Sequence, residues 1–292
     1  MSATNPPVVV GVDGSEQSLA AVRWAAQYAA RHRAPLRLIH ALGVPIDFSP
    51  GMAGPVFDLE SWRRAGHDLL ATARDAARAA AAPIAPIAPI EIFSVVADSA
   101  PVPTLRNHAQ DARLLVVGSR GLGAFGRVVL GSVSTALVRQ APCPVAVIPE
   151  SKSPAWHGPV VVGVDGSTSS AQAIAMAFEE ASERGVEVIA VHTWSEFYRY
   201  ESRAEMQTEA EALLAEGLAG YGEKYPEVPV TRIVTEDRPA RSLLREAATA
   251  QLIVLGSHGR GAFPGMTLGS VTHAVLHRAE CPLLVVRPRT QH

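Results

Sequence analysis

Two glycine-rich loops of the same spacing hold the residues of this chain best suited to binding chemistry. The first loop reads Gly118-Ser119-Arg120-Gly121, then nine residues, then Gly131-Ser132; the second reads Gly256-Ser257-His258-Gly259, then nine residues, then Gly269-Ser270. Glycines leave backbone N–H groups uncovered and permit tight turns, so a loop of this kind can wrap its amides around an anion. Each loop therefore predicts a phosphate-binding site.

Each loop is expected to deliver its anion to the start of a helix. Gly131 and Ser132 open a stretch predicted to be helical, and a helix N-terminus presents unbonded N–H groups and a partial positive charge. The Ser132 hydroxyl is expected to cap that helix or to reach a phosphate oxygen. The alternative is that the glycines serve only as turn residues. The same spacing in two loops argues against this alternative.

A carboxylate ends a valine-rich stretch in each half of the chain. Val8 to Asp13 and Val160 to Asp165 have the same sequence, VVVGVD. Such a carboxylate can accept hydrogen bonds from ribose hydroxyls or an adenine amine, or help to hold a divalent cation; alternatively, it caps the following helix. Binding is favoured, because ligands of open α/β sheets lie beyond the carboxyl ends of the strands.

A parallel sheet is needed to bring these residues together. In the first half, the hydrophobic pattern predicts strands at 8–13, 36–41, 91–96, 114–118 and 144–148, and helices at 15–33, 59–82, 102–110 and 132–140. The second half repeats this order. Strict alternation of strands and helices predicts parallel sheets, hence two tandem, doubly wound α/β domains of five strands each, at residues 1–150 and 158–292.

The composition excludes several classes of protein. With 26 Lys+Arg against 28 Asp+Glu and a net charge of −2, there is no basic excess to suggest a nucleic-acid partner. No apolar run reaches the roughly 18–20 residues that span a bilayer, and no secretory signal is recognisable. Two cysteines cannot form a disulfide framework. A cytoplasmic location is therefore expected.

The histidines and cysteines are expected to be structural. His40 and His192 end equivalent strands, and no cluster with metal-ligand spacing surrounds them. Cys143 and Cys281 each precede a proline and an apolar strand, so they are predicted to be small, buried, unreactive side chains.

On its motifs, the chain resembles the universal stress protein family. The shared motifs are V-x-V-G-V-D-G-S on the first strand, G-x2-G-x9-G-S, and a C-P followed by an apolar strand, and both halves carry all three. The resemblance implies a flavodoxin-like (Rossmann-like) fold, and ATP binding by members that carry the glycine signature. It further implies that Gly118, Gly121, Gly131 and Ser132 hold phosphates and ribose, and that Asp13 and the main chain near Ala41 hold the adenine end.

Two sets of site residues are therefore expected, and they differ in charge. The first site comprises Gly11, Asp13, Ala41, Gly118, Ser119, Arg120, Gly121, Leu122, Gly123, Ala124, Gly131, Ser132 and Val133. The second comprises Gly163, Asp165, Thr193, Gly256, Ser257, His258, Gly259, Arg260, Gly261, Ala262, Gly269, Ser270 and Val271. Arg120 and Arg127 in the first loop have His258 and Gly265 in their places in the second, so the two sites are expected to meet phosphate charge differently.

The function expected from these features is that of an ATP-binding regulator of stress response or growth state, with Mg²⁺ carried by the phosphates. No G-x4-G-K-[ST] P-loop is present, so efficient catalysis is not expected. The alternatives are a slow ATPase, and an interaction scaffold whose sites are empty or prefer cyclic AMP. The resemblance also implies pairing through the last strands, Val145 to Ile148 and Leu283 to Val286, either in a homodimer or between the two copies of one chain. A homodimer is expected; the protein partner is not identified.

Overall fold

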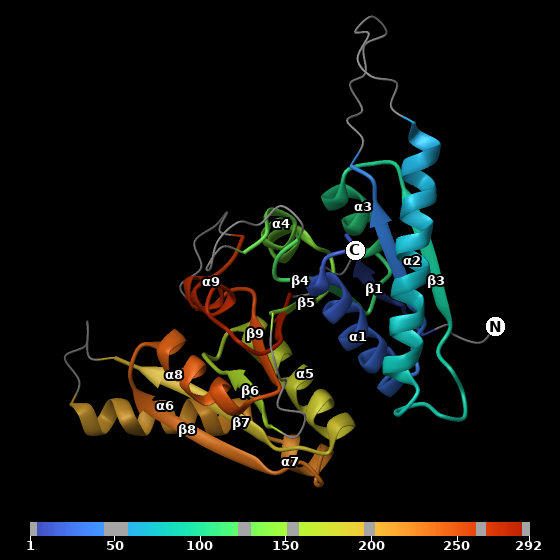
Figure 1. The fold of residues 1–292 in the computed structure, drawn as a ribbon. Coiled ribbons are helices and arrows are strands. Elements are labelled where there is room, and N and C mark those ends of the chain that lie inside the picture. The colour runs from blue at the N-terminus through green and yellow to red at the C-terminus, as the bar shows by residue number, and fades with distance from the viewer. Residues whose placement is uncertain are drawn as a thin grey trace, which may run out of the picture. The chain divides into compact units, whose positions relative to one another are not determined.

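Residues Met1–Glu150 and Ser151–His292 form two α/β units. A computed structural model describes residues 5–43, 58–121, 130–150, 158–195, 202–260 and 267–287. In Figure 1 the first unit runs from blue to green and the second from yellow-green to red.

Among its described residues, the first unit forms a parallel sheet of five strands with four helices. Its elements are β1 (Val8–Gly11), α1 (Glu16–Arg31), β2 (Leu36–Ala41), α2 (Leu59–Ala81), β3 (Ile92–Ala97), α3 (Pro101–His108), β4 (Leu114–Gly118), α4 (Ser132–Gln140) and β5 (Val145–Ile148). The strand order is β3-β2-β1-β4-β5. Helices α1 and α2 pack together, and so do α3 and α4. The predicted doubly wound fold is therefore confirmed.

The second unit repeats this arrangement. Its elements are β6 (Val160–Gly163), α5 (Thr168–Arg184), β7 (Val188–Trp194), α6 (Arg203–Gly217), α7 (Tyr221–Lys224), β8 (Val230–Glu236), α8 (Pro239–Glu246), β9 (Leu252–Gly256), α9 (Ser270–Leu276) and β10 (Leu283–Val286), with a 3₁₀ turn at Ala247–Thr249. The strand order is β8-β7-β6-β9-β10, and the pairs are parallel.

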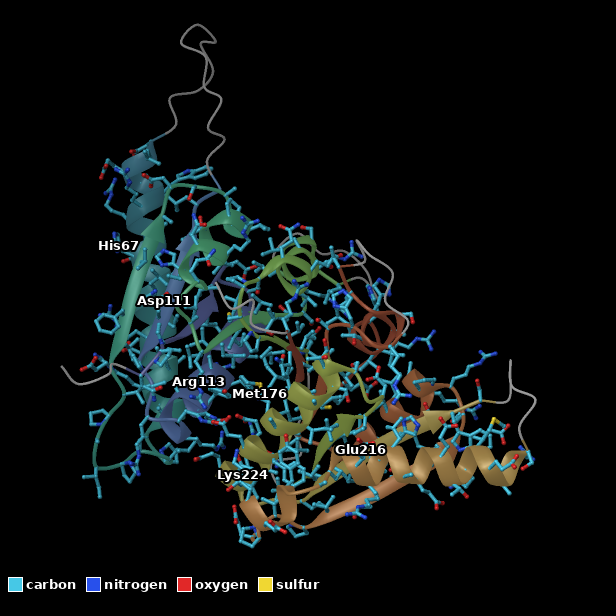
Figure 2. All side chains as sticks on the ribbon, turned by 180° about the vertical axis from the view of Figure 1, so that it is seen from behind. His67, Asp111, Arg113, Met176, Glu216 and Lys224 are labelled. Atoms are coloured by element: carbon cyan, nitrogen blue, oxygen red, sulfur yellow. The ribbon has the colours of Figure 1, made fainter. Side chains whose placement is uncertain are left out.

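The central strands are buried because helices cover the sheet. All three valines of β1 and of β6 are fully buried, as the unbroken apolar runs predict for parallel strands. Polar side chains lie on the outer faces of the helices, where Figure 2 shows Glu216 of α6 and Lys224 of α7. In each unit the sheet is thus a rigid layer whose strand ends can hold a site.

Local signals set the helix ends. The Ser15 hydroxyl accepts a hydrogen bond from the Ser18 N–H at 3.1 Å and caps α1, and Ser167 caps α5 in the same way. The prediction extended the first helix to Arg33, but it ends at Arg31 because Arg33 adopts a left-handed conformation, with φ of 49°. The first strand likewise ends at Gly11 rather than Asp13, before a turn at Gly14 (φ 88°).

Candidate functional site

Each unit has a pocket at the carboxyl ends of its central strands. In the first unit β1 lies between β2 and β4, and the chain leaves β1 toward β2 on one side and returns as β4 on the other. This is the switch point at which doubly wound sheets bind ligands. The pocket volume is about 610 Å³ in the first unit and about 280 Å³ in the second.

Most of the predicted residues lie around these pockets. Those that line the first are Gly11, Asp13, Ala41, Gly118, Arg120, Gly121, Gly131, Ser132 and Val133. Those that line the second are Gly163, Asp165, Thr193, Gly256, His258, Gly259, Arg260, Gly269, Ser270 and Val271. The predicted residues Leu122, Gly123, Ala124, Gly261 and Ala262 lie outside the described residues.

Asp13 braces the turn between β1 and α1 and also lines the pocket. Its Oδ1 accepts hydrogen bonds from the Ser15 N–H at 3.0 Å and from the Ser15 hydroxyl at 2.6 Å. Ser15, not Asp13, is the N-cap of α1. The carboxylate therefore fixes the residue that caps the helix, and it faces the glycine loop with its second oxygen.

The second glycine of each loop lies directly against this carboxylate. A methyl group on Gly121 would overlap Asp13 Oδ2, and one on Gly259 would overlap Asp165 Oδ2. In the second unit a hydrogen bond also holds the loop against the carboxylate, because the Arg260 N–H donates to Asp165 Oδ2 at 3.3 Å. Glycine is thus required where the loop closes on the carboxylate, and the contact is the same in both units.

The first glycine of each loop has a different role. Gly118 and Gly256 line their pockets, but a methyl group on Gly118 would meet the backbone of Gln17 at 3.1 Å, and one on Gly256 would meet Ser169 at 2.7 Å. These glycines therefore let the start of α1 or α5 approach the end of β4 or β9. Replacing them would disturb helix packing as well as the pocket.

The third glycine opens the helix that faces the pocket. Gly131 is the N-cap of α4, and no side-chain hydrogen bond caps the helix. The expectation that the Ser132 hydroxyl caps it is wrong, because Ser132 is already the first helical residue. Gly269 likewise precedes α9 without a side-chain cap. The N–H groups of a first helical turn have no intrahelical acceptor, so Ser132 and Val133 present donors at the pocket wall.

Ser119 and Ser257, also predicted as site residues, hold the ends of the loop and are not among the residues that line the pockets. The Ser119 N–H donates to the carbonyl of Ile148 at 2.8 Å, and its own carbonyl accepts from the Gly131 N–H at 2.8 Å. Ser257 repeats this pattern and is fully buried. The backbones of both residues therefore join the two ends of the loop to the last strand.

Two hydroxyls and an apolar wall were not predicted from the sequence. Ser134 Oγ donates to the Gly118 carbonyl at 2.6 Å, and Thr272 Oγ1 donates to the Gly256 carbonyl at 2.7 Å, so each helix is tied to its strand end. The apolar wall comprises Ile39, Pro101, Leu105 and Val117 in the first unit, and Val191, Pro239, Leu243 and Leu255 in the second. A proline at the start of the helix after the third strand, with a leucine four residues later, is a signal repeated in both halves.

The histidines at the strand ends support the backbone of the neighbouring strand. The ring Nδ1 of His40 lies 2.7 Å from the carbonyl oxygen of Val12, and that of His192 lies 2.6 Å from the carbonyl oxygen of Val164. A carbonyl only accepts, so each Nδ1 carries the proton and supports the backbone just before the site aspartate. Within the described ranges, no group of three His, Cys, Asp or Glu residues is arranged to hold a metal ion.

The cysteines are buried and free, as predicted. Burial raises the pKa of the Cys281 thiol to about 12, because the thiolate would lose its solvation. A disulfide-type thiol reagent at pH 8 is therefore expected to label native Cys281 far more slowly than the unfolded chain. The pKa of this thiol is higher in the folded chain than in the unfolded chain. The free energy of unfolding is therefore expected to fall as pH rises from about 9 toward 12. Rapid labelling of Cys281 in the native chain would contradict its burial.

Comparisons with known proteins match both units of the chain. The universal stress protein family matches residues 4–149 and again residues 157–287. The chain belongs to the universal stress protein family. A universal stress protein of Mycobacterium tuberculosis strain H37Rv is 46% identical over 291 residues, which cover 96% of each chain. One from Mycolicibacterium smegmatis is 41% identical over 298 residues, covering 99% of each.

The family fold extends over both units. The crystal structure of a universal stress protein from Archaeoglobus fulgidus aligns with 97% of this chain and 96% of its own, with a TM-score of 0.68 and 20% sequence identity. This likeness supports the tandem α/β fold. None of the described helices is both long and apolar enough to cross a membrane.

Proposed function

We propose that this universal stress protein binds one adenine nucleotide in each unit, as ATP with Mg²⁺ on its phosphates, and acts as a nucleotide-dependent regulator. The observation that carries the proposal is the matched construction of the two pockets. In each, apolar side chains and a glycine loop line one pocket; the second glycine of the loop closes on an aspartate, and the third glycine opens a helix without a side-chain cap.

The residues of the pocket fit the parts of a nucleotide. The wall of Ile39, Leu105 and Val117 offers an apolar surface for a base. The lining also includes Ser132 and Val133 at the start of α4, whose backbone N–H groups suit phosphate oxygens. We assign the Asp13 carboxylate, which lines the same pocket, to the ribose hydroxyls or the hydrated cation.

Regulation is proposed in preference to catalysis. The titratable side chains that line the first pocket within the described residues are Asp13 and Arg120. Asp13 is already engaged in bracing Ser15, and a guanidinium does not act as a base at neutral pH. We expect bound ATP to stay intact over many binding cycles; turnover that exceeds that of a site variant would instead establish a slow ATPase.

Removing the site aspartates should reduce nucleotide affinity. Asp13→Ala and Asp165→Ala are each expected to weaken one of two ATP sites about tenfold or more, because hydrogen bonds to a charged group contribute roughly 1.5–3 kcal/mol. Cys143→Ala, a change at a buried residue outside the pocket lining, is the control for general destabilisation. Calorimetric titration with Mg·ATP measures both. Equal losses in the aspartate and cysteine variants would place the site elsewhere.

Homodimerisation and a cytoplasmic location complete the proposal. The homodimer follows from the family resemblance, and the location follows from the composition and the low cysteine content. The chain has a mass of 30.8 kDa, so light scattering after size exclusion should give about twice that value. A mass equal to that of one chain would remove the homodimer from the proposal.

A further inference from the structure

The segment after the last strand contacts the glycine loop with opposite charge in the two units. After β5, Glu150 Oε2 lies 3.7 Å from Arg120 Nη1. After β10, Arg287 Nη2 donates to the carbonyl of Thr267 at 2.9 Å, two residues before Gly269. A negatively charged side chain thus contacts the loop of the first unit, and a positively charged side chain contacts the loop of the second.

The arginines of the two loops also differ in their surroundings. The residue in the place of Arg120 is His258, and the second loop carries its arginine two residues later, at Arg260. Arg260 lines the pocket, and its guanidinium lies against Gly166, at the turn before α5. Among the residues that the structure describes, no carboxylate forms an ion pair with the Arg260 side chain.

We infer that the two nucleotide sites differ in their preference for phosphate charge, and that Glu150 and Arg260 set this difference. In the first unit, a phosphate that approaches Arg120 must compete with the Glu150 carboxylate. In the second unit, Arg260 meets the phosphate without such a competitor. The second site therefore selects the more highly charged nucleotide, and the first discriminates less. This inference rests on the proposed function.

The expected magnitudes follow from the exposure of these groups. The side chains of Arg120 and Glu150 are 29% and 58% exposed, so their pair is partly screened by solvent. Removing such a competitor is expected to change affinity about two- to fivefold. Removing Arg260, which would bond a phosphate directly, is expected to cost about tenfold.

Calorimetry on the full chain, with ATP and with AMP as probes at a fixed Mg²⁺ concentration, tests the inference. Glu150→Gln should tighten only the weaker class of ATP site. Arg260→Leu should weaken only the tighter class. Both changes should be smaller for AMP, which carries less charge. Glu91→Gln and Arg232→Leu are matched controls, because both residues are exposed and lie outside both pocket linings, Glu91 directly before β3 and Arg232 on β8.

The outcomes separate this inference from the proposed function. The inference is overturned if Glu150→Gln leaves both ATP affinities unchanged, or if the two variants act on the same class of site. It is equally overturned if the control variants produce the same shifts. Absence of ATP binding in the wild-type chain would instead refute the proposed function itself.

Discussion

Gly121→Ala is expected to abolish nucleotide binding at one of the two sites, and Gly259→Ala at the other. The added methyl group would overlap the Asp13 or Asp165 carboxylate, so either the loop or the carboxylate must move. Neither glycine has a positive φ, so alanine fits the backbone and the effect is confined to this contact. Mg·ATP titration should give one nucleotide per chain for each single variant and none for the double variant.

The matched control is Gly222→Ala. A methyl group on Gly222, in α7, meets nothing within 4 Å, and this glycine also lacks a positive φ. Its ATP stoichiometry should equal that of the wild type. Two nucleotides per chain in the double variant Gly121→Ala/Gly259→Ala would show that the loop need not close on the carboxylate for binding.

The second large effect concerns a buried ion pair in the second unit. Arg184 Nη2 lies 2.9 Å from Glu180 Oε2 one turn earlier on α5, and the two side chains are only 6% and 1% exposed. Arg184 Nη1 also donates to Gln251 Oε1 at 3.0 Å, and Gln251 binds the carbonyl of Gly158 before β6. Arg184→Met should destabilise this unit by about 3–5 kcal/mol, because Glu180 keeps its buried charge without the guanidinium.

A double variant separates loss of the pair from loss of the buried charge. Glu180→Leu/Arg184→Met replaces both partners by apolar groups, so it should recover much of the stability lost in Arg184→Met. Amide hydrogen exchange, resolved at the level of peptides, measures the stability of β6 and α5 separately from that of the first unit. A double variant as unstable as the single one would show that packing around Arg184, rather than burial of charge, sets the stability.

The sequence predicted elements whose signals are local. The bounds of β2, β4 and α4 agree with the structure, since each is an apolar run or a periodic stretch between clear end signals. The two glycine loops were located for the same reason. Their spacing is a property of short segments, and the strand-loop-helix geometry follows from it.

Features that depend on distant segments were not predicted correctly. Gly118 contacts the backbone of α1, about 100 residues earlier in the chain, which no local pattern reveals. The backbone of Ser119 is bonded to the last strand, a contact that the sequence does not reveal. The apolar wall gathers Ile39 and Leu105 from β2 and α3. Such contacts become visible only when the strand order is known.

Nucleotide released from the freshly purified chain, identified by mass spectrometry after denaturation and followed by Mg·ATP titration, tests the central claim most directly. Two matched pockets predict a total of two ATP per chain, counting retained and added nucleotide. Absence of nucleotide in the purified chain, together with no binding in the titration, would contradict the assignment of the glycine loops to phosphate.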